Sequence, residues 1–237
     1  MKSKSIIFST EMVQATLAGY KKQTRRLVSS NIVSLINDKD VALENAASYY
    51  CPYQPGNQLW VRETWSPDHK NVYPFSSIVY KADYSLWELK EIQEHNHYDL
   101  DNPGSECLAC QNFRWRPSIH MKKRDSRITL EVTSVKIRRL QDITEDEALA
   151  EGCPICNKGQ HPWGDTISRF GRGVKDDALS NACGGKPWSL CFGSCGGLTA
   201  TEWFHSYWDL LYCTEDKDYA RWVANPYVWV IEFERKL

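Results

Sequence analysis

The chain of 237 residues lacks two features that mark membrane and secreted proteins. No apolar run approaches the roughly 20 residues that a membrane-spanning helix requires. The apolar stretch at residues 6–8 is far too short for the core of a signal peptide. We therefore expect a soluble, cytoplasmic protein that does not contact a membrane. The length is ample for one large domain, or two small ones, with a buried core.

An excess of charge of one sign is also missing. The 29 Lys and Arg residues nearly balance the 30 Asp and Glu residues, and the formal net charge is −1. This balance excludes a histone-like protein that binds nucleic acid through its total charge. The charges are nevertheless segregated along the chain. Residues 1–30 carry six basic side chains against one acidic, residues 83–106 seven acidic against one basic, and residues 114–139 nine basic against two acidic. A local basic face is therefore compatible with the sequence.

The cysteine pattern argues against a complete set of disulfide bonds. The nine cysteines are an odd number, and disulfides are rare in the cytosol. Four of them form two Cys-x-x-Cys pairs, Cys107 with Cys110 and Cys153 with Cys156, whose thiolates suit tetrahedral zinc. Zinc would hold together residues 153–198, which contain nine glycines and little apolar periodicity. The alternatives that stay open are free thiols and zinc ligand sets that draw on Cys183, Cys191, Cys195 and His161.

Hydrophobic periodicity predicts short strands with helices between them. We expect strands, from alternating apolar and β-branched residues, at residues 6–8, 58–63, 78–80, 127–133 and 227–233. We expect helices at residues 11–18, within 31–50, and after capping boxes at 144–147 and 199–202. Residues 20–26 are interpreted as a basic turn. The sequence has no internal repeat and no regular strand–helix alternation. It therefore predicts an α+β, mainly β fold: a small barrel with flanking helices.

Two motifs resemble those of a known family. The basic turn reads Gly19-x-Lys21-x-x-Thr24-x-Arg26, and residues 55–63 read Pro-Gly-Asn-Gln-Leu-Trp-Val-Arg-Glu. They are similar to the signature motif and the Gly-Asp-x-Leu-x-Val-x-Glu strand of the ASCH domain, a PUA-like β-barrel family associated with RNA. The chain has Asn where the family usually has Asp.

Three further pieces fall in the order that the family has. They are the strand at 127–133, the segment 140–151 and the closing strand at 230–233. Residues 115–121 resemble the longer phage and prophage members. The resemblance implies a single PUA-like barrel over residues 1–237, with inserts at about 83–113 and about 153–198 that lie outside the matched half of the chain.

One branch of the family is similar to an amidohydrolase that removes the acetyl group from N(4)-acetylcytidine. The branch uses a lysine as proton acceptor, a threonine as nucleophile and a glutamate as proton donor, which match Lys21, Thr24 and Glu151. Threonine needs a nearby base, and lysine can serve when burial or a cationic neighbour lowers its pKa. The alternative is a solvated basic turn that contacts phosphate, with Glu151 as an ordinary helix-end residue.

A binding function rests on basic and aromatic side chains, which contact phosphates and stack on bases. The alternative for tryptophans on strands is that they pack in the core. We expect a basic cleft that binds RNA or a modified nucleoside and that hydrolyses an amide there. The alternative is a non-catalytic phage or prophage interaction protein whose zinc-stapled insert docks a protein partner. Besides the three catalytic candidates, the predicted ligand-binding residues are Arg25, Arg26, Trp60, Arg62, Glu63 and Arg116.

Overall fold

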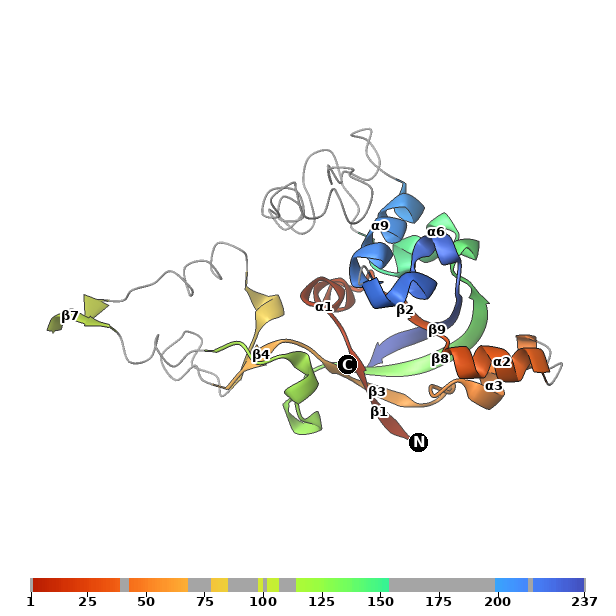
Figure 1. Ribbon diagram of the computed structural model, residues 1–237. Coiled ribbons are helices and arrows are strands. Elements are labelled where there is room, and N and C mark those ends of the chain that lie inside the picture. The colour runs from red at the N-terminus through yellow and green to blue at the C-terminus, as the bar shows by residue number, and fades with distance from the viewer. Residues whose placement is uncertain are drawn as a thin grey trace. The chain divides into compact units, whose positions relative to one another are not determined.

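A computed structural model describes residues 2–38, 43–67, 78–84, 98–99, 102–106, 114–153, 199–212 and 215–236. Strands and helices alternate irregularly along the chain (Figure 1). The largest sheet has five strands in the order β1 (Ser3–Ile7), β3 (Gln58–Arg62), β8 (Thr129–Arg139), β9 (Tyr227–Lys236) and β2 (Gln23–Leu27). Within the described ranges, no pairing joins the two outer strands. The mixed, mainly strand content is therefore confirmed. The pairings among the described strands do not show closure into a barrel.

The chain folds into two compact units. Unit 1 comprises Met1–Lys2, Ala15–Gln58 and Leu130–Leu237, and unit 2 comprises Ser3–Gln14 and Leu59–Thr129. In the part of the chain that the structure describes, no helix is both long and apolar enough to cross a membrane.

In unit 1, β2 pairs with β9 in antiparallel orientation, with Thr24 opposite Ile231 and Arg25 opposite Val230. This pairing corrects the interpretation of residues 20–26 as a turn. Gln23, Thr24 and Arg25 are all buried. Their backbone N–H and C=O groups need hydrogen-bond partners away from water, and pairing with the largely buried β9 supplies them.

The helices of unit 1 begin at the expected signals. Helix α6 (Glu145–Ala150) has a complete capping box, with Thr144 and Glu147 each accepting from the backbone N–H of the other. Helix α9 (Ala200–Tyr212) begins with the equivalent pair, Thr199 and Glu202. Residues 31–50 form two helices, α2 (Ser30–Asp38) and α3 (Leu43–Tyr50), instead of one. The core shared by α6, α9 and β9 contains Leu140, Ile143, Ala148, Cys153, Ala200, Phe204, Trp208, Val228 and Val230.

Unit 2 is built from shorter elements. Strand β4 (Trp65–Ser66) pairs with β5 (Val79–Tyr80), and β6 (Tyr98–Asp99) pairs with β7 (Asn102–Glu106). The 3-10 turns η2 (Ser118–His120) and η3 (Lys123–Asp125) follow. Buried side chains of this unit include Phe8, Leu59, Val61, Met121 and Ile128.

The capping box of α6 provides a first test. We expect Thr144→Ala to lower the free energy of unfolding by about 1 kcal/mol, because the backbone N–H of Glu147 loses its acceptor. Urea unfolding of both proteins measures the difference. Thr133→Ala, at an exposed position of β8, is the control and should change stability by at most about 0.5 kcal/mol. Equal losses in the two variants would show that the cap is not stabilising.

Candidate functional site

Lys21 and Glu151, far apart in the sequence, are in direct contact in unit 1. Gly19 follows the end of helix α1 (Thr10–Leu17), and its φ of 81° turns the chain back. The N–H of Lys21 donates to the Ala15 carbonyl at 3.1 Å. The Lys21 Nζ then donates to Glu151 Oε2 at 2.9 Å and to the Glu151 carbonyl oxygen at 2.7 Å. Both residues are buried, with 3% and 5% of their surface exposed. The predicted juxtaposition of these two residues is therefore present.

A second cation and a second carboxylate extend this contact. Arg25 donates to Glu151 Oε1 at 3.0 Å and to Glu147 Oε2 at 2.8 Å. The two glutamates are four residues apart, so that they lie on one face around the end of α6. Arg138 donates to the other oxygen of Glu147 at 3.0 Å. Lys21, Arg25, Glu147 and Glu151 are called the Lys21–Glu151 cluster below.

Burial dominates the electrostatics of Lys21. Removal of the ammonium from water lowers the pKa of Lys21 below its ordinary value of 10.5, although the Glu151 carboxylate opposes this shift. The positive charges of Arg25 and Arg26 lower the pKa further. The neutral amine, which is the form that accepts a proton, is therefore favoured more strongly than in an exposed lysine.

Gly152 allows this close approach. Its φ is 96°, a backbone conformation that residues other than glycine rarely adopt. A Cβ atom added at Gly152 would lie 2.8 Å from the Cβ of Ala15 and 3.3 Å from the Cβ of Lys21. Glycine at this position is therefore a requirement for placing Lys21 beside the end of α6.

Thr24 is completely buried in β2. Its hydroxyl has no hydrogen-bond partner among the described residues. Successive side chains of a strand alternate between its two faces, so Thr24 and Arg26 leave β2 on the face opposite to Gln23 and Arg25. The structure thus joins Lys21 and Glu151 directly. The Thr24 hydroxyl makes no hydrogen bond to either of them and, by this alternation, leaves β2 on the face opposite to Arg25, which binds Glu151.

The predicted ligand-binding residues of unit 1 have internal partners. Both ends of the Arg25 guanidinium are bound by the glutamates of α6, and the group lies 5.6 Å from the centre of the Phe204 ring. Arg26 is half-buried and donates to the carbonyl of Arg25 at 3.1 Å. Arg25 therefore holds the cluster together, and its guanidinium is occupied by protein groups.

The remaining predicted ligand-binding residues lie in unit 2. Glu63 is buried, and Arg127 binds its two carboxylate oxygens at 3.0 Å each. Burial raises the pKa of Glu63 in spite of this partner. The guanidinium of Arg62 lies 5.0 Å from the ring centre of Trp60. Arg116 is exposed and lies 5.7 Å from the ring centre of Trp65.

Only one of the four predicted zinc ligands lies within the described residues. Cys107, Cys110 and Cys156 lie outside them. Cys153 is buried in the apolar core of unit 1, and this burial raises the pKa of its thiol to about 12. The four-cysteine zinc site stays a prediction, because three of its ligands lie outside the described residues. Across the described ranges, no group of three or more His, Cys, Asp or Glu side chains suits a metal ion.

The sequence did not predict a site role for three residues: Glu147, which belongs to the Lys21–Glu151 cluster, and Gln23 and Arg138, which bind Glu147. Glu147 was assigned only to the capping box, yet its spacing from Glu151 places two carboxylates on one helix face. Gln23 follows from the strand, because it shares a face with Arg25 and donates to the Glu147 carbonyl at 2.6 Å. The turn interpretation concealed this alternation.

Scans of the chain against family models, curated proteins and solved structures return no match. The ASCH resemblance therefore depends on the sequence motifs.

The lowered pKa of Lys21 predicts a pH dependence of stability. Between the lowered pKa of the folded protein and the ordinary value of 10.5, the unfolded chain binds more protons. The free energy of unfolding of the wild type should therefore rise with pH relative to Lys21→Met. Urea unfolding between about pH 7 and 10 measures this difference. The neighbouring exposed Lys22, as Lys22→Met, is the control, and parallel curves for wild type and Lys21→Met would contradict the prediction.

The close packing at Gly152 predicts a second effect. We expect Gly152→Ala to lower the free energy of unfolding by about 2 kcal/mol or more, through backbone strain and the clash with Ala15. Gly56→Ala is the matched control, since Gly56 also has a positive φ, of 78°, but open space around its Cβ position. Thermal and urea unfolding compare the two variants. An equal loss in both would mean that packing against α1 contributes nothing.

Proposed function

We propose that the Lys21–Glu151 cluster is the active site of an amidohydrolase that acts on an N-acetylated cytidine, free or within RNA. The observation that carries this proposal is the hydrogen bond between the Lys21 amine and the Glu151 carboxylate at 2.9 Å, in surroundings that lower the pKa of the lysine. The ASCH resemblance supplies the substrate class. The proposal includes the PUA-like barrel of that family, with two inserts, and a phage or prophage origin.

In the proposed reaction, Lys21 and Glu151 each accept one proton and donate one proton. The neutral Lys21 amine accepts the proton of the Thr24 hydroxyl, and the threonine oxygen attacks the acetyl carbonyl carbon. The proton passes across the hydrogen bond to Glu151, which donates it to the leaving N4 nitrogen as the C–N bond breaks. Water then hydrolyses the acetyl-threonine ester, and acetate leaves. The products are cytidine and acetate.

The hydroxyl of Thr24, buried and without a hydrogen-bond partner among the described residues, is compatible with this role, which also requires it to come within hydrogen-bond reach of the Lys21 amine. A buried hydroxyl without a hydrogen bond costs about 1–3 kcal/mol, and valine has the same shape without that cost. A threonine that serves packing alone gains nothing from its hydroxyl here. A nucleophile, in contrast, requires it.

Arg25 and Glu147 are positioning residues in this proposal. Arg25 binds one oxygen of Glu151, which leaves the other oxygen to Lys21, and Glu147 holds the second end of the guanidinium. The orientation of the Glu151 carboxylate is thereby fixed from two sides. Rigid placement of the reacting groups is a major source of catalytic rate.

The test is the release of cytidine from N(4)-acetylcytidine by purified protein. We expect activity in the wild type, and a loss of about 100-fold or more in Lys21→Met and in Glu151→Gln. Thr24→Val should lose activity as well, and its free energy of unfolding should be equal to or about 1 kcal/mol above that of the wild type. Lys22→Met, at the exposed neighbour of Lys21, should retain full activity.

Thr24→Val separates chemistry from stability, because a loss of activity in a more stable protein cannot come from unfolding. Circular dichroism and thermal unfolding establish that Lys21→Met and Glu151→Gln are folded. Absence of cytidine release from the wild type, or release that Lys21→Met leaves unchanged, would contradict the hydrolase. The cluster would then be a purely structural ion-pair network.

A further inference from the structure

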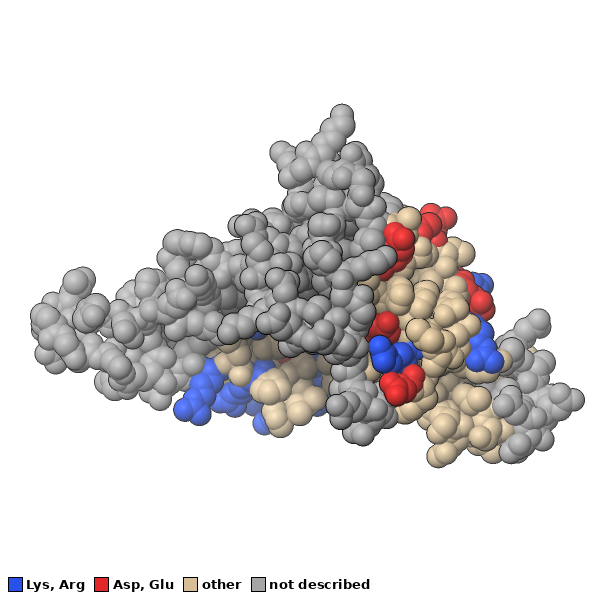
Figure 2. Space-filling model, turned by 45° about the horizontal axis from the view of Figure 1, so that its top comes forward, with Lys and Arg blue, Asp and Glu red and all other residues tan. Residues whose placement is uncertain are grey.

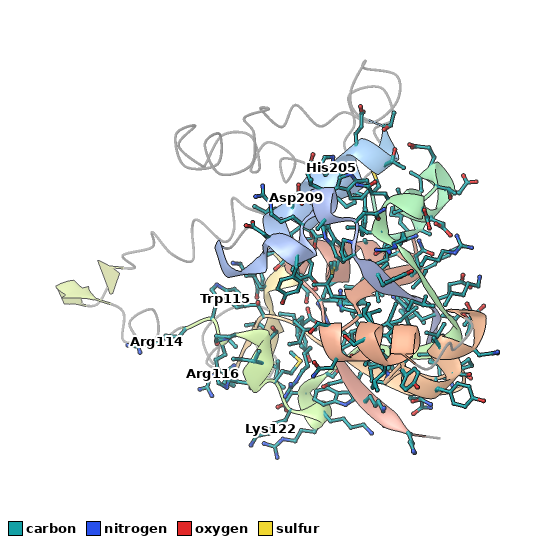
Figure 3. The ribbon with its side chains drawn as sticks, turned by 45° about the vertical axis from the view of Figure 1, so that its right-hand side comes forward. Arg114, Trp115, Arg116, Lys122, His205 and Asp209 are labelled. Carbon is teal, nitrogen blue, oxygen red and sulfur yellow. The ribbon has the colours of Figure 1, made fainter. Side chains whose placement is uncertain are left out.

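A segment of unit 2 is rich in exposed basic side chains. Residues 114–124 contain five Lys and Arg residues, one His and no Asp or Glu. All six basic side chains are exposed. Figure 2 shows Lys and Arg gathered over this part of the molecule, and in Figure 3 the labelled Arg114, Arg116 and Lys122 lie along one edge of it. The six residues, called the 114–124 basic surface, are Arg114, Arg116, His120, Lys122, Lys123 and Arg124.

The backbone beneath this surface is fixed by contacts within unit 2. Arg116 exchanges two backbone hydrogen bonds with Trp65, at 2.7 and 3.3 Å. Met121 is completely buried, and its carbonyl accepts from Arg62 at 3.2 Å. Hydrogen bonds and burial thus hold the backbone that carries these charged side chains, so that less conformational entropy is lost when a ligand binds.

Three acidic side chains that the structure describes in unit 2 have basic partners. Glu63 and Asp83 both bind Arg127, at 3.0 and 2.7 Å. Asp125 is buried, with its carboxylate 3.5 Å from Arg124. Residues 114–124 themselves contain no acidic side chain, and Asp125 lies against one of their five Lys and Arg residues, so the segment carries a net positive charge.

The composition of the surface favours nucleic acid over protein as that partner. Interfaces between proteins have an apolar core that is depleted in charge, whereas interfaces with nucleic acid are polar and positive. The only exposed large apolar side chain in residues 114–124 is Ile119. Arginine guanidinium groups, in addition, match phosphate oxygens in geometry.

We infer that the 114–124 basic surface binds the phosphodiester backbone of a single nucleic-acid strand. We expect this strand to be RNA, and that preference over DNA rests on the proposed function. The contact with the phosphodiester backbone rests on the surface itself.

The test is fluorescence anisotropy of a labelled single-stranded oligouridylate RNA of about 12 nucleotides, at about 50 to 200 mM salt. The variant Arg114→Gln/Lys122→Gln/Lys123→Gln should bind about tenfold or more weakly than the wild type. The dependence of log K on log salt should become shallower by about 2, because three phosphate contacts on a single strand are lost. The control is Lys2→Gln/Lys136→Gln/Lys236→Gln, which removes the same charge from unit 1 and should leave binding within about twofold.

Equal losses in the two triple variants, or no loss in the first, would overturn the inference. Tighter binding of an acidic polyglutamate peptide than of RNA, through the same three residues, would replace nucleic acid by an acidic protein. A DNA strand of the same sequence distinguishes the two nucleic acids. Cytidine release from free N(4)-acetylcytidine is measured on the same proteins and should be equal in the first triple variant and the wild type. RNA binding without release defeats the hydrolase alone, and release without RNA binding defeats this inference alone.

Discussion

The contact between Lys21 and Glu151 is the constraint around which unit 1 is organised. It joins the chain after α1 to the end of α6, two regions 130 residues apart. A buried ammonium and a buried carboxylate are each costly, and removal of one partner from such a pair costs about 3–5 kcal/mol. The bend at Gly19, the pairing of β2 with β9 and the absence of a side chain at Gly152 all have to be present for the two groups to meet.

Within the Lys21–Glu151 cluster every charge has an opposite charge beside it. Arg25 reaches both glutamates, and Glu147 also binds Arg138 and completes the capping box of α6. The helix end is therefore held by its carboxylates as much as by its apolar face. Networks of this kind specify one arrangement because a partly paired state leaves a buried charge without a partner. Such order is what a reaction between fixed groups requires.

Sequence patterns predicted the elements that local chemistry determines. The capping boxes at Thr144 and Thr199 and the alternating strands were recovered because caps and side-chain period act within a few residues. The ASCH resemblance predicted that Lys21 and Glu151 lie together, and their side chains are 2.9 Å apart. The contacts that Gln23 and Arg25 make with Glu147 and Glu151 were not predicted, because residues 20–26 were interpreted as a turn. The charged residues of β2 are buried only because β2 pairs with β9, which follows some 200 residues later. No local pattern carries that information.

The two units use positive charge in opposite ways. In unit 1, Lys21 and Arg25 are buried in surroundings of low dielectric constant, and their partners are the glutamates that the fold places beside them. Such charges act at short range, and salt screens them little. On the 114–124 basic surface, solvent weakens each charge individually, so recognition needs several of them in a row and declines with salt. A chain with a net charge of −1 can therefore contain both a buried, paired set of charges and an exposed basic surface, since burial and clustering, rather than total charge, decide what each lysine and arginine does.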